Sequence, residues 1–257
     1  MRLLIVVTIV IIIVVAWFFS QHPKGDLVLA VCTEDLQWLQ AQQNLYRQIF
    51  IYSKCERPLP EYVTHMNNVR THRLQNVGSC DYVILSHIIL EWDRLTGMIT
   101  FGKGKDHDQK SQVLCVGTQH FDEVPCDLNW SLGDWSFTNN KTQTFDFHKS
   151  GFENHGEWIV DCFGEEMADH MLRTYTRVAY GGWFTVNAKD VKRYPLCMYK
   201  RMRYYQMFAN EEVDHFIERA WGMLFTCDCT KTFTEEYFDS LNDPNVSIKE
   251  WHKMASE

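Results

Sequence analysis

Short apolar runs alternate with helix-period segments along the first half of the chain. Leu27–Val31 and Arg47–Ser53 have the length and composition of buried strands. Between them, Thr33 precedes two acids and spaced apolar positions, which predicts a helix over Glu34–Leu39 with Thr33 as its cap. A weaker helical pattern covers Tyr62–Val69. This part of the chain therefore predicts a strand, a helix, a second strand and a second helix.

The next segment has the strongest pattern in the sequence. Tyr82–Leu95 is an apolar run at helical spacing that ends before Gly97, and Met98–Phe101 then has the composition of a buried strand. Strands that alternate with helices form parallel sheets, because each connection crosses over to the next strand. We expect an α/β fold with a single mixed, largely parallel sheet flanked by helices.

The last part of the chain predicts further strands and helices around a less regular insertion. A strand is expected near Val113–Val116, an irregular excursion over Pro125–Lys149, a helix over Gly164–Arg177, a strand after the Gly181–Gly182 pair, and two helices over Met198–Phe208 and Glu211–Phe225. Two adjacent glycines before a strand allow a backbone or a ligand to approach closely.

The first residues predict a membrane anchor. Leu3–Phe19 is apolar and uncharged, and its length is close to the short limit of about 17 residues for a spanning helix. A cleaved signal peptide is the alternative, but Trp17–Ser20 lacks a small-x-small cleavage site. We expect residues 1–26 to be an anchor and short linker, residues 27–257 to be one domain, and the topology to be single-pass type II.

Charge, cysteines and sequons indicate the compartment. The formal net charge of -8 argues against a nucleic-acid partner. All nine cysteines follow the anchor, as expected in an oxidising lumen, and their odd number leaves at least one thiol free or paired between chains. Acceptor triplets begin at Asn129, Asn140 and Asn245. These features favour the Golgi or ER lumen, with the cell surface as the alternative.

Several short motifs, in this order, resemble a known family. Glu34–Leu39 (EDLQWL) is followed by Asn76-Val-Gly78, by Tyr82 with His87-Ile88, and by a strand ending at Phe101-Gly102. Gly182-Trp-Phe-Thr-Val186 and Glu218-Arg-Ala-Trp221 match the family's closing motifs. The set resembles glycosyltransferase-like domains that form a family still labelled as a domain of unknown function. The chain departs from it at Ser79-Cys80, where the family has Arg-Glu, and at Gly102–Asp108.

The resemblance implies a nucleotide-sugar-transferase type of fold, a nucleotide-sugar donor and a glycan acceptor. Asp106 and Asp108 fit a D-x-D arrangement after a buried strand, where carboxylates hold Mn²⁺ or Mg²⁺ against a diphosphate. Lys103 and Lys105 would add phosphate contacts. The alternative is a solvated turn of mixed charge, in which none of these side chains binds a ligand.

Further residues receive roles from the same resemblance. Glu218, or Glu212 on the same helix, is the candidate base for the acceptor hydroxyl; a salt bridge or a helix-end charge is the alternative for each. Asn76 and Gly78 would lie against the nucleotide, or serve only as turn residues. His87 is expected to be a satisfied core histidine. Because of the departures from the family, a catalytically inactive glycan- or protein-binding domain is the second hypothesis.

Overall fold

The structure is a computed structural model that describes residues 24–105, 112–114, 136–138, 144–146, 150–174, 182–207, 211–226 and 232–241. Its strands are Asp26–Val31 (β1), Gln48–Ser53 (β2), Val69–Arg73 (β3), Met98–Lys103 (β4), Gln112–Leu114 (β5), Ser136–Thr138 (β6), Thr144–Asp146 (β7) and Phe184–Asn187 (β8). Its α-helices are Trp38–Gln42 (α2), Glu61–Thr64 (α3), Cys80–Leu90 (α4), His155–Phe163 (α5), Glu165–Thr174 (α6), Ala188–Val191 (α7), Leu196–Gln206 (α8), Glu211–Thr226 (α9) and Glu235–Asp239 (α10).

The central sheet has six strands in the order β3-β2-β1-β4-β8-β5. Strands β3, β2, β1 and β4 are mutually parallel, β8 runs antiparallel to β4, and β5 is parallel to β8. Strands β6 and β7 form a separate antiparallel pair. The predicted mixed, largely parallel sheet is therefore confirmed.

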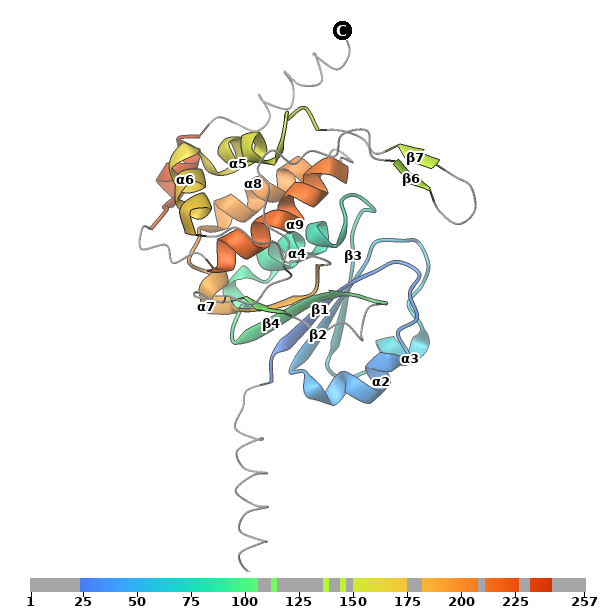
Figure 1. Ribbon diagram of the computed structural model, residues 1–257. Coiled ribbons are helices and arrows are strands. Elements are labelled where there is room, and N and C mark those ends of the chain that lie inside the picture. The colour runs from blue at the N-terminus through green and yellow to red at the C-terminus, as the bar shows by residue number, and fades with distance from the viewer. Residues whose placement is uncertain are drawn as a thin grey trace, which may run out of the picture.

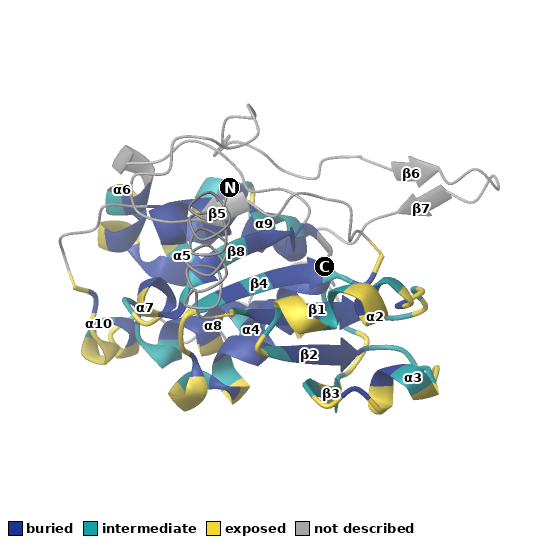
Figure 2. Cartoon of the chain, turned by 90° about the horizontal axis from the view of Figure 1, so that it is seen from below, coloured by how far each residue is buried: buried dark blue, intermediate teal, exposed yellow. Residues whose placement is uncertain are grey.

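Both faces of the sheet are covered, and the strand residues alternate between two cores. In β1, Val28 and Ala30 belong to the larger core, which includes residues of α4, α5, α6, α8 and α9, whereas Leu27 and Leu29 belong to the smaller core with residues of α2 and α3. Figure 1 shows the large helical layer on one side of the sheet and α2 and α3 on the other. The central strands are buried between these layers in Figure 2. Burial on both faces explains why β1 and β2 are almost continuously apolar.

Helix α4 follows from local sequence. The Ser79 hydroxyl caps it by accepting a hydrogen bond from the Asp81 amide at 3.3 Å. The helix ends at Leu90, and a 3₁₀ turn over Trp92–Arg94 leads to Gly97, whose φ of 66° favours glycine. The apolar run that predicted one helix over Tyr82–Leu95 is thus divided between an α-helix and a 3₁₀ turn.

The predicted helix over Glu34–Leu39 is wrong in its position. Helix α2 begins only at Trp38, and the two acids before it make turn contacts instead. Glu34 Oε2 accepts a hydrogen bond from the Cys32 amide at 2.5 Å, and Asp35 Oδ1 accepts one from the Gln37 amide at 2.9 Å. Carboxylates that bond to nearby backbone compete in this way with helix formation.

Strand β3 and helix α5 are among the elements that were not predicted from the sequence. Strand β3 (VRTHR) carries alternating polar residues and lies at the sheet edge, so it lacks the apolar run that identified β1 and β2. Helix α5 begins after Asn154, whose side chain accepts a hydrogen bond from the Glu157 amide at 3.0 Å. Its cap is a recognisable start, and Trp158, Ile159, Cys162 and Phe163 then form a buried apolar face, so the sequence did carry a signal for this helix.

The predicted anchor Leu3–Phe19 lies outside the described residues. In the part of the chain that the structure does describe, no helix is long and apolar enough to span a membrane. The three sequons at Asn129, Asn140 and Asn245 also lie outside it. The anchor and the glycosylation sites therefore stay predictions.

Candidate functional site

The strand order defines one preferred edge of the sheet. From β1 the chain runs to β2 and β3 on one side, and then crosses back to β4 on the other side of β1. In open α/β sheets, ligands bind outside the carboxyl ends of the strands where the connections change direction in this way. A ligand site is therefore expected at the carboxyl ends of β1 and β4.

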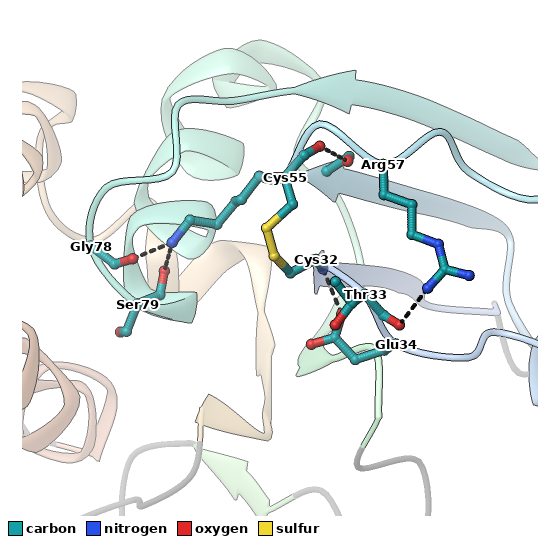
Figure 3. Close-up of a disulfide and its surroundings, with 9 residues drawn as sticks. Cys32, Thr33, Glu34, Cys55, Arg57, Gly78 and Ser79 are labelled. Atoms are coloured by element: carbon teal, nitrogen blue, oxygen red, sulfur yellow. Dashed lines mark hydrogen bonds between the residues drawn. A yellow bond between two sulfur atoms is a disulfide. The ribbon is translucent and has the colours of Figure 1, made fainter. Parts of the chain in front are cut away.

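A disulfide joins the two loops that leave β1 and β2. Cys32 directly follows β1, and it is bonded to Cys55, two residues after β2. Figure 3 shows this bond between Gly78 and Ser79 on one side and Arg57 on the other. The disulfide holds the rim of the carboxyl edge in a fixed arrangement. The oxidising compartment expected from the cysteine distribution stays a prediction.

A cavity of about 380 Å³ opens between these loops. Its lining residues come from the end of β1, from the segments that follow β1 and β2, and from α3: Val31, Cys32, Thr33, Glu34, Asp35, Gln37, Arg57, Pro58, Leu59, Pro60 and Tyr62. The Tyr62 hydroxyl lies 3.5 Å from Asp35 Oδ1, and Arg57 donates to the Thr33 carbonyl at 3.4 Å. The cavity therefore combines an aromatic ring, one cation and two acids.

Lys54 connects the end of β2 to the start of α4. Its ammonium group donates to the carbonyl oxygens of Gly78 and Ser79, the latter at 2.9 Å. Burial lowers the pKa of Lys54, while the carboxylate of Asp214 acts in the opposite direction. The lysine thus places positive charge beside the turn that opens α4.

Asp81, in the first turn of α4, is an enclosed acid at this edge. It is 2% exposed and accepts hydrogen bonds from Trp221 Nε1 at 2.6 Å and from the Ser79 hydroxyl at 2.5 Å. Burial raises the pKa of Asp81, and nearby Glu218 adds to this, while the two hydrogen bonds and Lys103 act against it. Two acids and a lysine from three distant segments therefore interact here.

Close packing joins β4, α4 and the segment before β8. Gly182 has a φ of 68°, and a side chain there would collide with the Cys80 sulfur and come within 3.6 Å of Lys103 Cε. Gly102 in β4 has the ring of Trp183 against it, so that a Cβ would lie 2.6 Å from ring atoms. The group that approaches Gly182 is the side chain of Cys80, whereas the double glycine predicted the approach of a backbone or a ligand; Gly181 lies outside the described residues.

Helices α8 and α9 contribute Gln206 and Asp214, whose side chains pack against Gly78. Gln206 Nε2 donates to Asp214 Oδ1 at 2.7 Å, and both atoms lie near the position that a Gly78 side chain would occupy. Gly78 has a φ of 59°, so that both its backbone and its surroundings favour glycine. On α9, Glu218 Oε2 lies 3.7 Å from His215 Nδ1.

The structure brings some of the sequence-predicted residues together and leaves others apart. Gly78, Lys103 and Glu218 surround the Cys80–Asp81 turn. Asn76 and Lys105 are exposed. Glu212 is buried, and its carboxylate accepts hydrogen bonds from the Ser150 amide at 2.5 Å and from the Ser150 hydroxyl at 2.6 Å. Asp106 and Asp108 lie outside the described residues.

Sequence reasoning missed Lys54, Asp81 and the residues of the cavity wall, among them Arg57. Lys54 follows a buried strand directly, and Asp81 lies in the first turn of the strongest predicted helix, so both positions carried a recognisable pattern. Arg57, on the cavity wall, lies in a Pro-punctuated loop that gives no such indication.

In the described ranges, no group of three or more His, Cys, Asp or Glu side chains is arranged to hold a metal ion. Comparisons with protein-family models, with curated proteins and with solved structures found no match for this chain. The fold class and the site geometry therefore stand on the chain's own residues.

Proposed function

We propose that this chain is a membrane-anchored, lumenal glycosyltransferase-like protein that binds a nucleotide-sugar donor at the carboxyl edge of β1 and β4 and transfers the sugar to a glycan acceptor. The observation that carries the proposal is the cavity of about 380 Å³ at the carboxyl end of β1. It lies beside the strand at which the connections change direction, where α/β folds bind nucleotides.

The cavity suits the nucleoside part of such a donor. The Tyr62 ring offers an aromatic surface, and Gln37 and Asp35 offer polar groups that can pair with a base or a ribose. Arg57 adds a cation on the same wall. A nucleoside held here would lie beside the end of β1, whose neighbour β4 carries Lys103 at its own end.

Cations near the end of β4 suit the diphosphate. Lys103 interacts with the Cys80–Asp81 turn, and the exposed Lys105 follows two residues later. Next in the chain come Asp106 and Asp108, whose carboxylates are the ligand type that Mg²⁺ and Mn²⁺ prefer. These two residues would hold the metal, which supplies neutralisation of the leaving diphosphate when bound.

Glu218 is the better placed of the two candidate bases. Its side chain is 15% exposed and lies near Asp81 and Lys103, whereas Glu212 is enclosed and already accepts two hydrogen bonds from Ser150. A base must reach the acceptor hydroxyl, and only a carboxylate with some access to the site can do so.

Calorimetry on the full-length chain in maltoside micelles tests the proposal. Common nucleoside diphosphate sugars are titrated with and without Mn²⁺, and saturable, Mn²⁺-enhanced binding is expected. Lys103→Ala should weaken that binding about tenfold, since a charge-assisted contact to phosphate is lost. Lys189→Ala is the matched control, because it removes the same charge from an exposed position at the opposite edge of the sheet. No saturable binding of any donor would refute the proposal.

A specific observation favours a second candidate, a domain of the same fold that binds glycan or protein without catalysis. Several acids at the carboxyl edge are engaged by structural partners: Asp81 by Trp221, Asp214 by Gln206, and Glu212 by Ser150. A turnover assay separates the two candidates. Donor binding with neither sugar transfer nor donor hydrolysis, identical in the wild type and in Glu218→Gln, would favour the silent domain.

A further inference from the structure

A second cavity, of about 220 Å³, lies at the opposite, amino-terminal edge of the sheet. Its wall is formed by the starts of β1, β2 and β3, the end of α4, and the turn before β4: Asp26, Arg47, Gln48, Phe50, Arg70, His87, Glu91, Arg94 and Leu95. None of these residues belongs to the proposed donor site. The cavity therefore needs its own explanation.

His87 is the least exposed residue of this wall, at 1%. Its Nδ1 lies 3.0 Å from the Tyr52 hydroxyl, and its Nε2 is buried without a hydrogen-bond partner in the described structure. Burial lowers the pKa of His87 to about 3, so the ring is neutral at ordinary pH and carries a single proton. The expectation of a satisfied core histidine is thus met at one nitrogen only.

The position of that proton follows from the hydrogen bond with Tyr52. The contact between the Tyr52 hydroxyl and His87 Nδ1 fits either direction of donation, but the two directions differ in cost. If the phenol donates, only Nε2 lacks a partner, whereas if Nδ1 donates, both the phenol hydrogen and Nε2 lack one, so donation from the phenol is favoured. The imidazole proton then resides on Nε2. His87 therefore presents an unused N–H donor, and a buried donor without an acceptor is costly.

The arginines of the wall leave a surplus of positive charge. Arg47 pairs with Asp26 through two hydrogen bonds, at 2.8 and 2.5 Å, and Arg94 lies 3.3 Å from Glu91. The guanidinium of Arg70 lies 5.8 Å from the centre of the Phe50 ring and has no carboxylate partner among the described residues. Two acids are thus neutralised, and a third cation and an unpaired donor remain.

We propose that this cavity is a binding site for a small oxyanion of the phosphate type, held by the Arg70 guanidinium and the His87 Nε2–H. A guanidinium presents parallel donors that match two oxygens of such an ion, and the neutral imidazole adds a third donor. The ligand must offer acceptor oxygens to these two groups, because the Arg70 guanidinium and the His87 Nε2–H are both donors. The cavity offers several times the roughly 30 Å³ that one water molecule occupies in the liquid.

Inorganic phosphate titrated into the full-length chain in maltoside micelles tests the site by calorimetry. Saturable binding is expected, and Arg70→Gln should weaken it about tenfold. Arg73→Gln is the matched control, because it removes the same charge from the same strand, three residues away and therefore on the other face. The control should stay within about twofold of the wild type. Phosphate that does not saturate, or equal losses in the two variants, would overturn the proposal.

A second readout reports on His87 directly. With ¹⁵N-labelled histidine, phosphate should shift the His87 Nε2 resonance in the wild type and leave it unshifted in Arg70→Gln at the same phosphate concentration. An unshifted resonance in the wild type removes His87 from the site and contradicts the proposal.

The phosphate group has two possible sources, a free ion or a lipid headgroup, and vesicles distinguish them. The full-length chain is reconstituted into phosphatidylcholine vesicles with or without phosphatidic acid, whose headgroup is a phosphate monoester. If phosphatidic acid weakens the Arg70-dependent binding of inorganic phosphate, the lipid headgroup occupies the site. If the affinity is the same in both vesicles, the site takes the soluble ion.

Discussion

The two edges of the sheet carry charge in different ways. At the amino edge, Arg94 and Glu91 are three residues apart, and Arg47 reaches Asp26 on the neighbouring parallel strand. At the carboxyl edge, the interacting groups come from the end of β2, the start of α4, the end of β4, and α9. The amino edge is therefore assembled from neighbours, and the carboxyl edge only from the complete fold.

This difference has an energetic consequence. The amino-edge arginines are partly exposed, so solvent screens their ion pairs and each contributes little. Asp81 at the carboxyl edge is enclosed, so water cannot take the place of a hydrogen-bond partner that a mutation removes. Mutations at the carboxyl edge should therefore cost more than mutations of the exposed charges at the amino edge.

The largest effect is expected for Asp81→Ala. The change leaves Trp221 Nε1 without an acceptor and removes the acid that faces Lys103. We expect a loss of about 4 kcal/mol in the free energy of unfolding, the size typical of a broken buried charge network. Urea denaturation measures it, with the exposed Asp93→Ala as the control, which should change by less than about 0.5 kcal/mol. Equal losses in both variants would show that Asp81 has no special role.

His87 lies at the amino edge but is buried, so a large contribution to stability is expected from it as well. Burial lowers the pKa of His87 to about 3 in the folded state, whereas an unfolded histidine has a pKa near 6.5. Below pH 6.5 the unfolded chain binds a proton that the native chain does not, so this contribution to stability is complete above pH 6.5 and is lost as pH falls.

Between pH 6 and pH 4 that loss should approach about 3 kcal/mol, because each pH unit corresponds to about 1.4 kcal/mol. Urea denaturation across this range measures it, with His87→Gln as the comparison, since glutamine does not titrate. The difference in slope between the two proteins isolates the histidine from all other groups. Parallel pH profiles would mean that His87 is accessible to protons in the native state.

Much of the fold could be predicted from hydrophobic pattern because the pattern reflects burial on both faces. The strands β1 and β2 and helix α9 are apolar where the layers meet, and all three were placed correctly to within a few residues. Strand β3 was missed because one edge of it is unpaired and its side chains are mostly exposed. Hydrophobic periodicity therefore identifies the buried elements and fails for the exposed edge strand.

The candidate site was less predictable than the fold, because the residues of the carboxyl edge come from segments that are far apart in the sequence. Lys103 and Glu218 were predicted from motifs. No pattern in the neighbouring sequence indicates that the Lys54 ammonium group donates to the turn before α4, or that Trp221 Nε1 donates to Asp81. Glu212 has the sequence context of a helix-end acid, and its contacts with Ser150 are visible only in three dimensions. Pairings between distant segments require the tertiary structure.

Two glycines with nearly the same backbone offer a test of packing at the carboxyl edge. Gly182 has a φ of 68° and the Cys80 sulfur in the way of a side chain, whereas Gly97 has a φ of 66° and nothing within 4 Å. Gly97→Ala should cost about 1 kcal/mol for the left-handed backbone alone. Gly182→Ala should cost about 2 kcal/mol or more, because overpacking is added. Thermal unfolding of both variants gives the comparison, and equal costs would mean that Cys80 moves aside freely.

The smallest effects are expected for the amino-edge arginines, and they rank by geometry. The Arg94 side chain is 72% exposed and makes one contact with Glu91, so Arg94→Ala should change the free energy of unfolding by no more than about 0.5 kcal/mol. Arg47 is 45% exposed but bonds Asp26 in a bidentate manner, and Arg47→Ala should cost about 1 kcal/mol after allowance for solvent screening. Urea denaturation at low and at high salt measures both, and salt should reduce the Arg47 effect because partly exposed pairs are screened. An Arg47→Ala cost as large as that of Asp81→Ala would erase the distinction between the two edges.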